Sequence, residues 1–492
     1  MSLKAQVVHG LKWQAISIVG RQLLSMVVFT SLARLLSPSA FGLVALVSVY
    51  LGFVAMFIDQ GIATALIQRQ NPEPGHLDTA FWFNMGCAIV LCLGTIILAG
   101  PISLLFHEPR LIPLLRWSSL GLIIGASSAI HATLFTKAMD FRQPVIRGLI
   151  ANVAGGIVGI GMALTGCGVW SLVGQQLAGE VAGAAFLWGM SNYRPSFRFS
   201  WLHLRQLFGF SSSVFAASIL WYFSSRLDQM VVGRFYGAFE LGLYSIAGKI
   251  PNLANMLTQQ PVASVSLPAL SKLQEDHARM RQTVYQGMEL NAFISFAVFV
   301  GVAAVAPELV PLLFGAKWAS AAALCSLLSL YSLMETLQVF SYPILLASGG
   351  IGKYVLLNVW HVIGVLVACF AGVEWGVNYL VLGLILNSLI LAIPVLLFLR
   401  QRIGLSISAY CRPCCVPAVA SLLMVGAIWL LNSYLPADFS LIFRLLCKVI
   451  VGGVVYIGCT FLLAPSIFKK LLGAVSHAFR RSNILKTAPT TV

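Results

Sequence analysis

Two stretches, ARLLSPSAFGLVAL at residues 33–46 and GRFYGAFELGLYSI at residues 233–246, carry the same pattern 200 residues apart. In each, an arginine (Arg34 or Arg234) is followed eight residues later by Gly-Leu, and a short turn joins two long apolar runs. Six apolar runs separate the two copies, so the copies have the same orientation. The pattern therefore predicts two parallel repeats related by an axis along the membrane normal.

A plainer interpretation of this pattern is that both arginines end helices at the lipid headgroups, while the glycines allow helices to pack closely. Under either interpretation the two copies have the same architecture. Internal symmetry of this kind is typical of transporters, in which the substrate lies between two lobes.

The composition indicates an integral membrane protein. Of the 492 residues, 59% are apolar and only 9% are charged, and the mean hydropathy is +0.90. Lys and Arg number 31 against 15 Asp and Glu, which gives a net charge of +16. No polar domain exists that could present a basic groove to nucleic acid, so we interpret the basic excess as membrane topology.

The apolar runs are long and continuous, which predicts helices rather than a β-barrel. A helix needs about 20 residues to cross a bilayer, and about fourteen runs meet this length. The predicted spans are 12–35, 41–66, 80–105, 112–136, 145–165, 168–190, 207–232, 241–262, 289–314, 319–346, 353–373, 376–399, 414–435 and 441–464.

Alternate connections between these spans differ in charge. By the positive-inside rule the basic set is cytoplasmic, so both termini are expected in the cytoplasm. The apolar stretch after the N-terminus is long and lacks a cleavage site, which favours a retained span over a signal peptide. The opposite set is poor in cations and short. The basic set includes Lys4, Arg69, Lys137, Arg142, Arg147, Arg194, Arg198, Arg205, Lys272, Arg279, Arg281, Lys353, Arg400, Arg402, Arg412 and the tail cations Lys469, Lys470, Arg480, Arg481 and Lys486.

The expected fold class is therefore an all-α polytopic membrane protein with two parallel-repeat lobes of six helices and two further C-terminal helices. The expected organisation is an N-terminal lobe at 1–190, a cytoplasmic linker at 191–206, a C-terminal lobe at 207–400, two extra spans at 401–464 and a basic cytoplasmic tail at 465–492.

Several motifs resemble one known family. They are MSLKxxVxxGxKW at 1–13, LARLLSPSAFGL at 32–43, FIDQGIATALIQRQ at 57–70, AFWFN at 80–84, RLDQMVVGRFYG at 226–237, LGLYSIAGKIPNL at 241–253 and LPALSKLQEDHARMR at 267–281. Together they resemble the polysaccharide-transporter branch of the multidrug/oligosaccharidyl-lipid/polysaccharide (MOP) exporter superfamily. Within this branch, the motifs are most similar to those of flippases of the colanic acid exporter type, which transport lipid-linked oligosaccharides.

The resemblance implies a V-shaped, two-lobed bundle in the bacterial inner membrane. Its cargo would be an undecaprenyl-diphosphate-linked oligosaccharide unit for exopolysaccharide or lipopolysaccharide, and a polymerase and chain-length machinery are candidate partners besides the lipid bilayer. The implied energy source is an ion gradient of H+ or Na+, or the membrane potential, without a cofactor. The chain agrees, since it has no G-x-x-x-x-G-K-[ST] phosphate loop.

Two alternatives stay open. One is a multidrug or other lipid exporter of the same fold. The other, which the short outer loops disfavour, is a polytopic polysaccharide polymerase. We expect a transporter rather than an enzyme, with no catalytic residues.

Three cations are candidates to line a watery cavity for a diphosphate, because charges inside a membrane usually face a cavity or a partner and Arg suits bidentate phosphate contacts. They are Arg21, Arg226 and Lys249. Arg21 lies deep in the first span, where the alternative is a buried ion pair. For Lys249, which precedes Pro251, the alternative is snorkelling to the headgroups.

Three carboxylates are candidates for ion coupling: Asp59, Asp228 and Glu335. Asp59 stands in an Asp-Gln-Gly context that also suits a helix break. Asp228 lies two residues after Arg226, so the two point about 200° apart on a helix and are poor mutual partners. Glu335, in the middle of the tenth run, is the strongest of the acidic candidates.

Other titratable residues are weaker candidates. His131 and His361 could titrate, but single histidines on apolar helices more often hydrogen-bond to a neighbour. The ten cysteines lie mostly in apolar runs, where thiols behave as small hydrophobes. Cys411 and Cys414 have CxxC spacing without a second pair of ligands, so no metal site is predicted.

Overall fold

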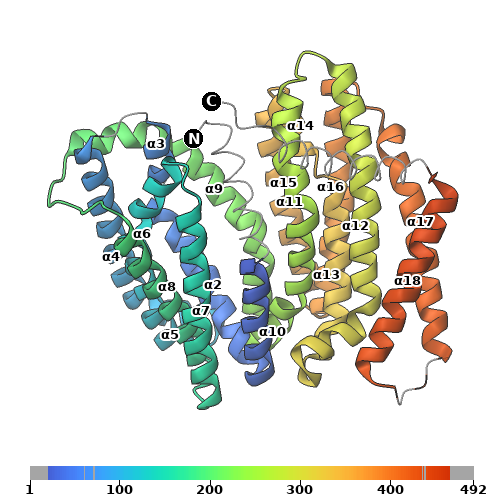
Figure 1. Ribbon diagram of the computed structural model, residues 1–492, viewed down its shortest axis with the longest axis horizontal. Coiled ribbons are helices and arrows are strands. Elements are labelled where there is room, and N and C mark those ends of the chain that lie inside the picture. The colour runs from blue at the N-terminus through green and yellow to red at the C-terminus, as the bar shows by residue number, and fades with distance from the viewer. Residues whose placement is uncertain (1–19, 60, 70–72, 435, 437–438, 466–492) are drawn as a thin grey trace, which may run out of the picture. The chain divides into compact units, whose positions relative to one another are not determined.

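In the computed structural model, residues 20–59, 61–69, 73–434, 436 and 439–465 are described. The side chains of 59, 208–218, 220, 221 and 351 are outside this description. Every regular element within it is a helix, which confirms the all-α class (Figure 1). The chain forms two compact units, Met1–Ser245 and Ile246–Val492.

The first unit contains an N-terminal helix at 20–35, followed by α2 (Pro38–Asp59), α3 (Ile62–Gln68), α4 (Pro74–Phe106), α5 (Leu111–Ser118), α6 (Leu120–Lys137), α7 (Arg142–Leu164), α8 (Trp170–Met190), α9 (Trp201–Phe235) and most of α10 (Gly237–Ala247).

The second unit contains α11 (Lys249–Ser271), α12 (His277–Phe314), the short 3-10 helix η1 (Ala316–Trp318), α13 (Ala321–Thr336), α14 (Ser341–Ala347), α15 (Ile351–Gly372), α16 (Val377–Ile403), α17 (Ile407–Tyr434) and α18 (Leu441–Leu463).

Ten stretches of the described helices are long and apolar enough to cross a membrane. Many of their large apolar side chains point outward, as for Ile97, Leu104 and Leu462, each more than three-quarters exposed. In water such surfaces would be costly, whereas in lipid they face hydrocarbon. The protein is therefore a polytopic membrane protein.

Small residues bring helices together within the first unit. α7 and α8 run side by side in Figure 1. A Cβ atom built on Gly155 of α7 would lie 2.5 Å from the carbonyl oxygen of Gln175, and one on Gly179 of α8 would lie 2.9 Å from that of Ala151. Close backbone approach gives van der Waals contact where no hydrophobic driving force exists between helices.

A buried ion pair joins α12 to α18 in the second unit. Lys448 Nζ lies 2.6 Å from Glu308 Oε1, and both side chains are only 5% exposed. Arg444 NH2 lies 3.6 Å from the same carboxylate oxygen. Because an unpaired charge in hydrocarbon is costly, Glu308 holds the C-terminal span against α12.

The beginning of α12 differs from the sequence-based interpretation. The apolar run was expected from residue 289, but α12 begins at His277 and includes the polar residues that follow it. The helix continues through Pro307 and Glu308 to Phe314, where the predicted span also ends. The Lys448 partner, 140 residues away, explains how a carboxylate is tolerated there, and local sequence cannot reveal it.

We expect Lys448→Ala to destabilise the protein by about 3–5 kcal/mol, the usual cost of leaving a buried charge unpaired. The double variant Glu308→Leu/Lys448→Met should recover most of this loss, because it removes both charges. Arg444→Gln should cost less, since its side chain is 23% exposed and its contact is longer. Thermal unfolding in detergent measures all three, and equal losses for the single and double variants would contradict the pairing.

Candidate functional site

The glycines of the repeated motif face each other where α2 crosses α10. A Cβ atom on Gly42 would lie 1.6 Å from the carbonyl oxygen of Ala238, and one on Gly242 would lie 1.9 Å from that of Pro38. Pro38 precedes Gly42 by four residues, and Ala238 precedes Gly242 by four residues. Each glycine therefore contacts the same position of the other helix. Only glycine permits this approach, because any Cβ would overlap a backbone oxygen.

Asp228 lies near this crossing, in the last two turns of α9. Tyr244 of α10 donates a short hydrogen bond to its Oδ2. Its Oδ1 is buried and has no hydrogen-bond partner among the described residues. A buried acceptor without a donor is costly, and it usually marks a place for a proton, a water molecule or an ion.

Arg226 stands on the same helix but has a different partner. Its side chain is exposed, and NH1 donates to Gln229 Oε1 at 3.3 Å. One turn earlier, Tyr222 donates to the backbone oxygen of Val49 and so attaches α9 to α2. Phe223 extends this contact, since its ring centroid lies 5.3 Å from that of Phe53.

Arg21 lies on the N-terminal helix, against α7. Its side chain is exposed, and its Cδ lies 3.2 Å from the position of a Cβ on Gly148. Among the described residues, no carboxylate lies within 4.0 Å of Arg21 or Arg226. Both arginines are therefore available to a soluble or lipid anion.

Two further predicted residues lie at helix ends. Lys249 is the half-buried first residue of α11, in the second unit. Asp59 is the last residue of α2, and its side chain lies outside the described residues. Their roles stay predictions.

Glu335 lies in the last turn of α13 and is exposed. The next residue, Thr336, belongs to a buried polar network. In that network Gln259 Nε2 donates to Ser295 Oγ at 2.7 Å and to Thr336 Oγ1 at 3.1 Å. Gln259 Oε1 and Asn291 Nδ2 are buried there without hydrogen-bond partners in the described structure.

Sequence reasoning did not select Glu180 and Arg147 as site residues. Arg147 was counted with the basic connections, although the predicted span 145–165 includes it; it lies inside α7, and Glu180 lies inside the neighbouring α8. Glu180 Oε1 accepts from Gln176 at 3.1 Å, while its Oε2 and Arg147 Nε are buried without hydrogen-bond partners among the described residues. A single acid in the apolar run 168–190 was the available signal.

The two histidines considered from sequence are in different surroundings. His131 is fully buried, and the centroid of its ring lies 4.7 Å from that of Trp188. Neither of its ring nitrogens has a hydrogen-bond partner in the described part of the chain. The backbone oxygen of His361 accepts from Asn387.

Comparisons with known proteins agree with this architecture. The family model described as "Polysaccharide biosynthesis protein" matches residues 31–323. The succinoglycan biosynthesis transport protein ExoT of Rhizobium meliloti is 26% identical, over 95% of each chain. The lipopolysaccharide biosynthesis protein WzxC of Escherichia coli is 28% identical, over 68% of this chain and 69% of the relative.

Two solved structures share the fold. The lipid II flippase MurJ in an inward closed conformation has a TM-score of 0.75 at 16% identity, with 92% of this chain and 99% of that chain covered. An inward-facing multidrug resistance MATE transporter of the MOP superfamily has a TM-score of 0.62 at 17% identity, with 78% and 94% covered.

The ten candidate spans and the shared fold define a polytopic α-helical membrane protein. The chain belongs to the family described as "Polysaccharide biosynthesis protein". This confirms the resemblance stated from its motifs.

We expect Gly42→Ala and Gly242→Ala to separate α2 from α10, because each added Cβ would overlap a backbone oxygen. Both variants should unfold at lower temperature than the unchanged protein in detergent. The matched control is Gly94→Ala on α4, where nothing lies within 4 Å of the added atom. Unfolding temperatures that are equal for all three variants would show that the crossing tolerates a side chain.

Proposed function

We propose that the protein is a secondary-active flippase that moves undecaprenyl-diphosphate-linked oligosaccharide units across the bacterial inner membrane for exopolysaccharide or lipopolysaccharide biosynthesis. The observation that carries the proposal is the pair of exposed arginines, Arg21 and Arg226, on helices of a family that serves polysaccharide synthesis. A lipid diphosphate must not cross hydrocarbon unpaired, and guanidinium groups offer it bidentate contacts.

The names of similar proteins support this cargo class. One is a succinoglycan transport protein, another a lipopolysaccharide biosynthesis protein, and the neighbour in fold is a lipid II flippase. Two of these names concern a polysaccharide, and the third concerns a lipid flippase. A polymerase and chain-length machinery are the partners that such a step would need.

The proposed topology has fourteen spans with both termini in the cytoplasm. The ten candidate spans would be completed by helix 20–35, α8, α9 and the α10–α11 region. Two parallel repeats of six spans, followed by α17 and α18, account for the Arg-x7-Gly-Leu pattern. The cation-rich connections support this orientation.

A multidrug or other lipid exporter is the alternative cargo class, and the similarity in fold to a MATE transporter favours keeping it. Deletion of the gene separates the two. Loss of a surface polysaccharide, with its lipid-linked unit accumulating in the inner leaflet, supports the flippase. Drug sensitivity with intact polysaccharide supports the alternative.

We expect Arg226→Ala to reduce polysaccharide export at least about tenfold, the scale of one lost charge-assisted phosphate contact. Arg21→Ala should have a similar effect, and Arg226→Lys should retain part of the activity. Arg234→Ala, two turns further along α9, is the control. Export is measured as surface polysaccharide, normalised to the amount of protein in the membrane, and normal export by both Ala variants would exclude the proposed roles.

Ion coupling is proposed to depend on carboxylates at the membrane spans. Asp228→Asn should lower export, because Oδ1 can then no longer hold an ion or exchange a proton. Tyr244→Phe, which removes the hydrogen bond to Oδ2 but keeps the carboxylate, should have a smaller effect, and Glu335→Gln tests the other candidate. Transport into vesicles with imposed H+ or Na+ gradients identifies the ion, and a gradient response unchanged in Asp228→Asn and Glu335→Gln would rule out both.

A further inference from the structure

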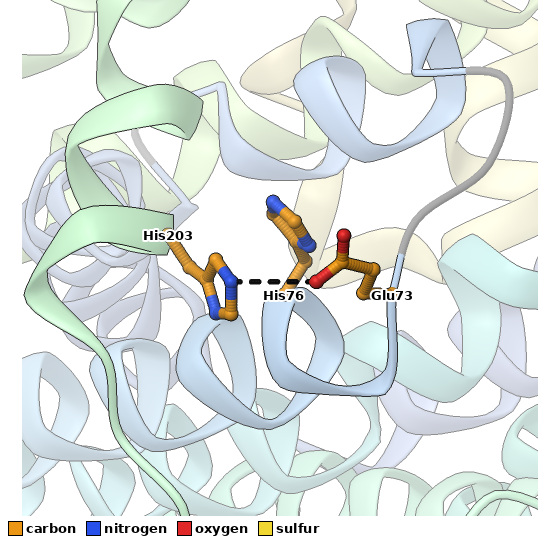
Figure 2. Close-up of side chains that lie close together, drawn as sticks. All are labelled: Glu73, His76 and His203. Atoms are coloured by element: carbon orange, nitrogen blue, oxygen red, sulfur yellow. Dashed lines mark ion pairs between the residues drawn. The ribbon is translucent and has the colours of Figure 1, made fainter.

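Three potential metal ligands from distant parts of the chain meet at the beginnings of α4 and α9 (Figure 2). Glu73 precedes α4, His76 lies in its first turn, and His203 lies in the first turn of α9. One ligand atom from each residue lies within 4.8 Å of the others. His203 Nε2 is 3.6 Å from Glu73 Oε2, and the centroids of the two imidazole rings are 4.1 Å apart.

The hydrogen bonds of His76 decide which of its nitrogens is available. His76 is only 1% exposed, and its Nε2 lies 2.9 Å from Gln206 Oε1. An amide oxygen only accepts, so Nε2 carries a proton, and in the neutral ring Nδ1 then presents a lone pair. Nδ1 is buried with no hydrogen-bond partner among the described residues, and Figure 2 shows the ring beside the Glu73 carboxylate.

This pattern is the one that metal-ligating histidines show, with the second ring nitrogen donating to a fixed acceptor. Gln206 is itself held, since Arg69 NH1 donates to the same oxygen at 3.0 Å. The lone pair of His76 and the carboxylate of Glu73 are both acceptors. Two converging acceptors need a cation or a donor between them.

Other contacts between α4 and α9 hold the three residues in place without occupying their ligand atoms. Ser200 caps α9, and its backbone N–H donates to Thr79 Oγ1 of α4 at 3.1 Å. A Cβ atom on Gly75 would lie 2.6 Å from His203 Cε1, so glycine at this position allows the imidazole to lie over the beginning of α4. The two helix ends are therefore joined by other contacts before any ion binds.

We propose that Glu73, His76 and His203 form a binding site for a divalent transition metal, with zinc as the expected ion. Two imidazoles and one carboxylate suit zinc, whereas calcium and magnesium prefer oxygen ligands alone. Ligand atoms bound tetrahedrally at about 2.0–2.1 Å lie about 3.4 Å from one another, and the distance from Glu73 to His203 is already close to this. Water would complete the coordination, because the Glu73 side chain is 69% exposed to solvent.

A bound metal would cross-link α4 to α9 through residues that are 127 positions apart in the sequence. It would stabilise the folded protein in proportion to the occupancy of the site. This inference does not depend on the proposed cargo. The competing interpretation is a protonated His203 that forms only an ion pair with Glu73.

The test uses full-length protein without a histidine tag, purified in detergent and treated with chelator. After equilibration with zinc, the unchanged protein should hold about one more zinc ion per chain than a His203→Gln variant. Zinc should also raise the unfolding temperature of the unchanged protein. Glu73→Gln should weaken binding at least about tenfold, as expected for a lost ligand contact, without unfolding the protein, because Glu73 is mostly exposed. His107→Asn at the opposite end of α4 is the control and should bind as the unchanged protein does.

Cobalt distinguishes this site from the ten cysteines. With thiols alkylated, Co2+ should give visible d–d bands that are lost in His203→Gln and weakened in Glu73→Gln, without an intense near-ultraviolet thiolate band. Equal metal content, equal spectra and an equal zinc-dependent stabilisation in the unchanged protein and both variants would overturn the proposal. Stability that depends on pH but not on zinc would leave only the ion pair between His203 and Glu73, and would also overturn it.

Discussion

Hydrocarbon offers no hydrogen-bonding partner, and this constraint governs the whole structure. Each backbone amide in a span must bond within its own helix, which explains why every described regular element is helical. The same constraint makes each polar side chain in a span significant. A carboxylate or guanidinium must find a partner, reach the headgroups or face water.

Helix packing follows from the absence of water. Lipid is as apolar as leucine, so helices gain little by burying apolar side chains against each other. Close backbone contact at small residues takes over this role at Gly155 and Gly179, and again where Gly42 meets Gly242. In the second contact, the glycines of the two copies of the repeated motif pack against each other. This close packing is a physical reason for glycine at both positions.

Charged side chains on the described helices show two different arrangements. Glu308 and Lys448 neutralise each other in a nearly dry environment and tie the last span to α12. Arg21 and Arg226 remain exposed, with no carboxylate within 4.0 Å in the described chain. The first arrangement serves stability, while the second would suit the anionic cargo that we propose.

Hydropathy and spacing alone determined the all-α membrane class, and the motifs identified the family, because span length and turn chemistry are local properties. The Arg-x7-Gly-Leu repeat likewise pointed to equivalent helices, but the tertiary structure revealed that its glycines touch. Sequence could not pair Glu308 with Lys448, nor Asp228 with Tyr244. The sequence also offered no reason to group Glu73 and His76 with His203. A ligand set or an ion pair depends on side chains from distant helices, and only the packing of those helices brings them within a few ångströms.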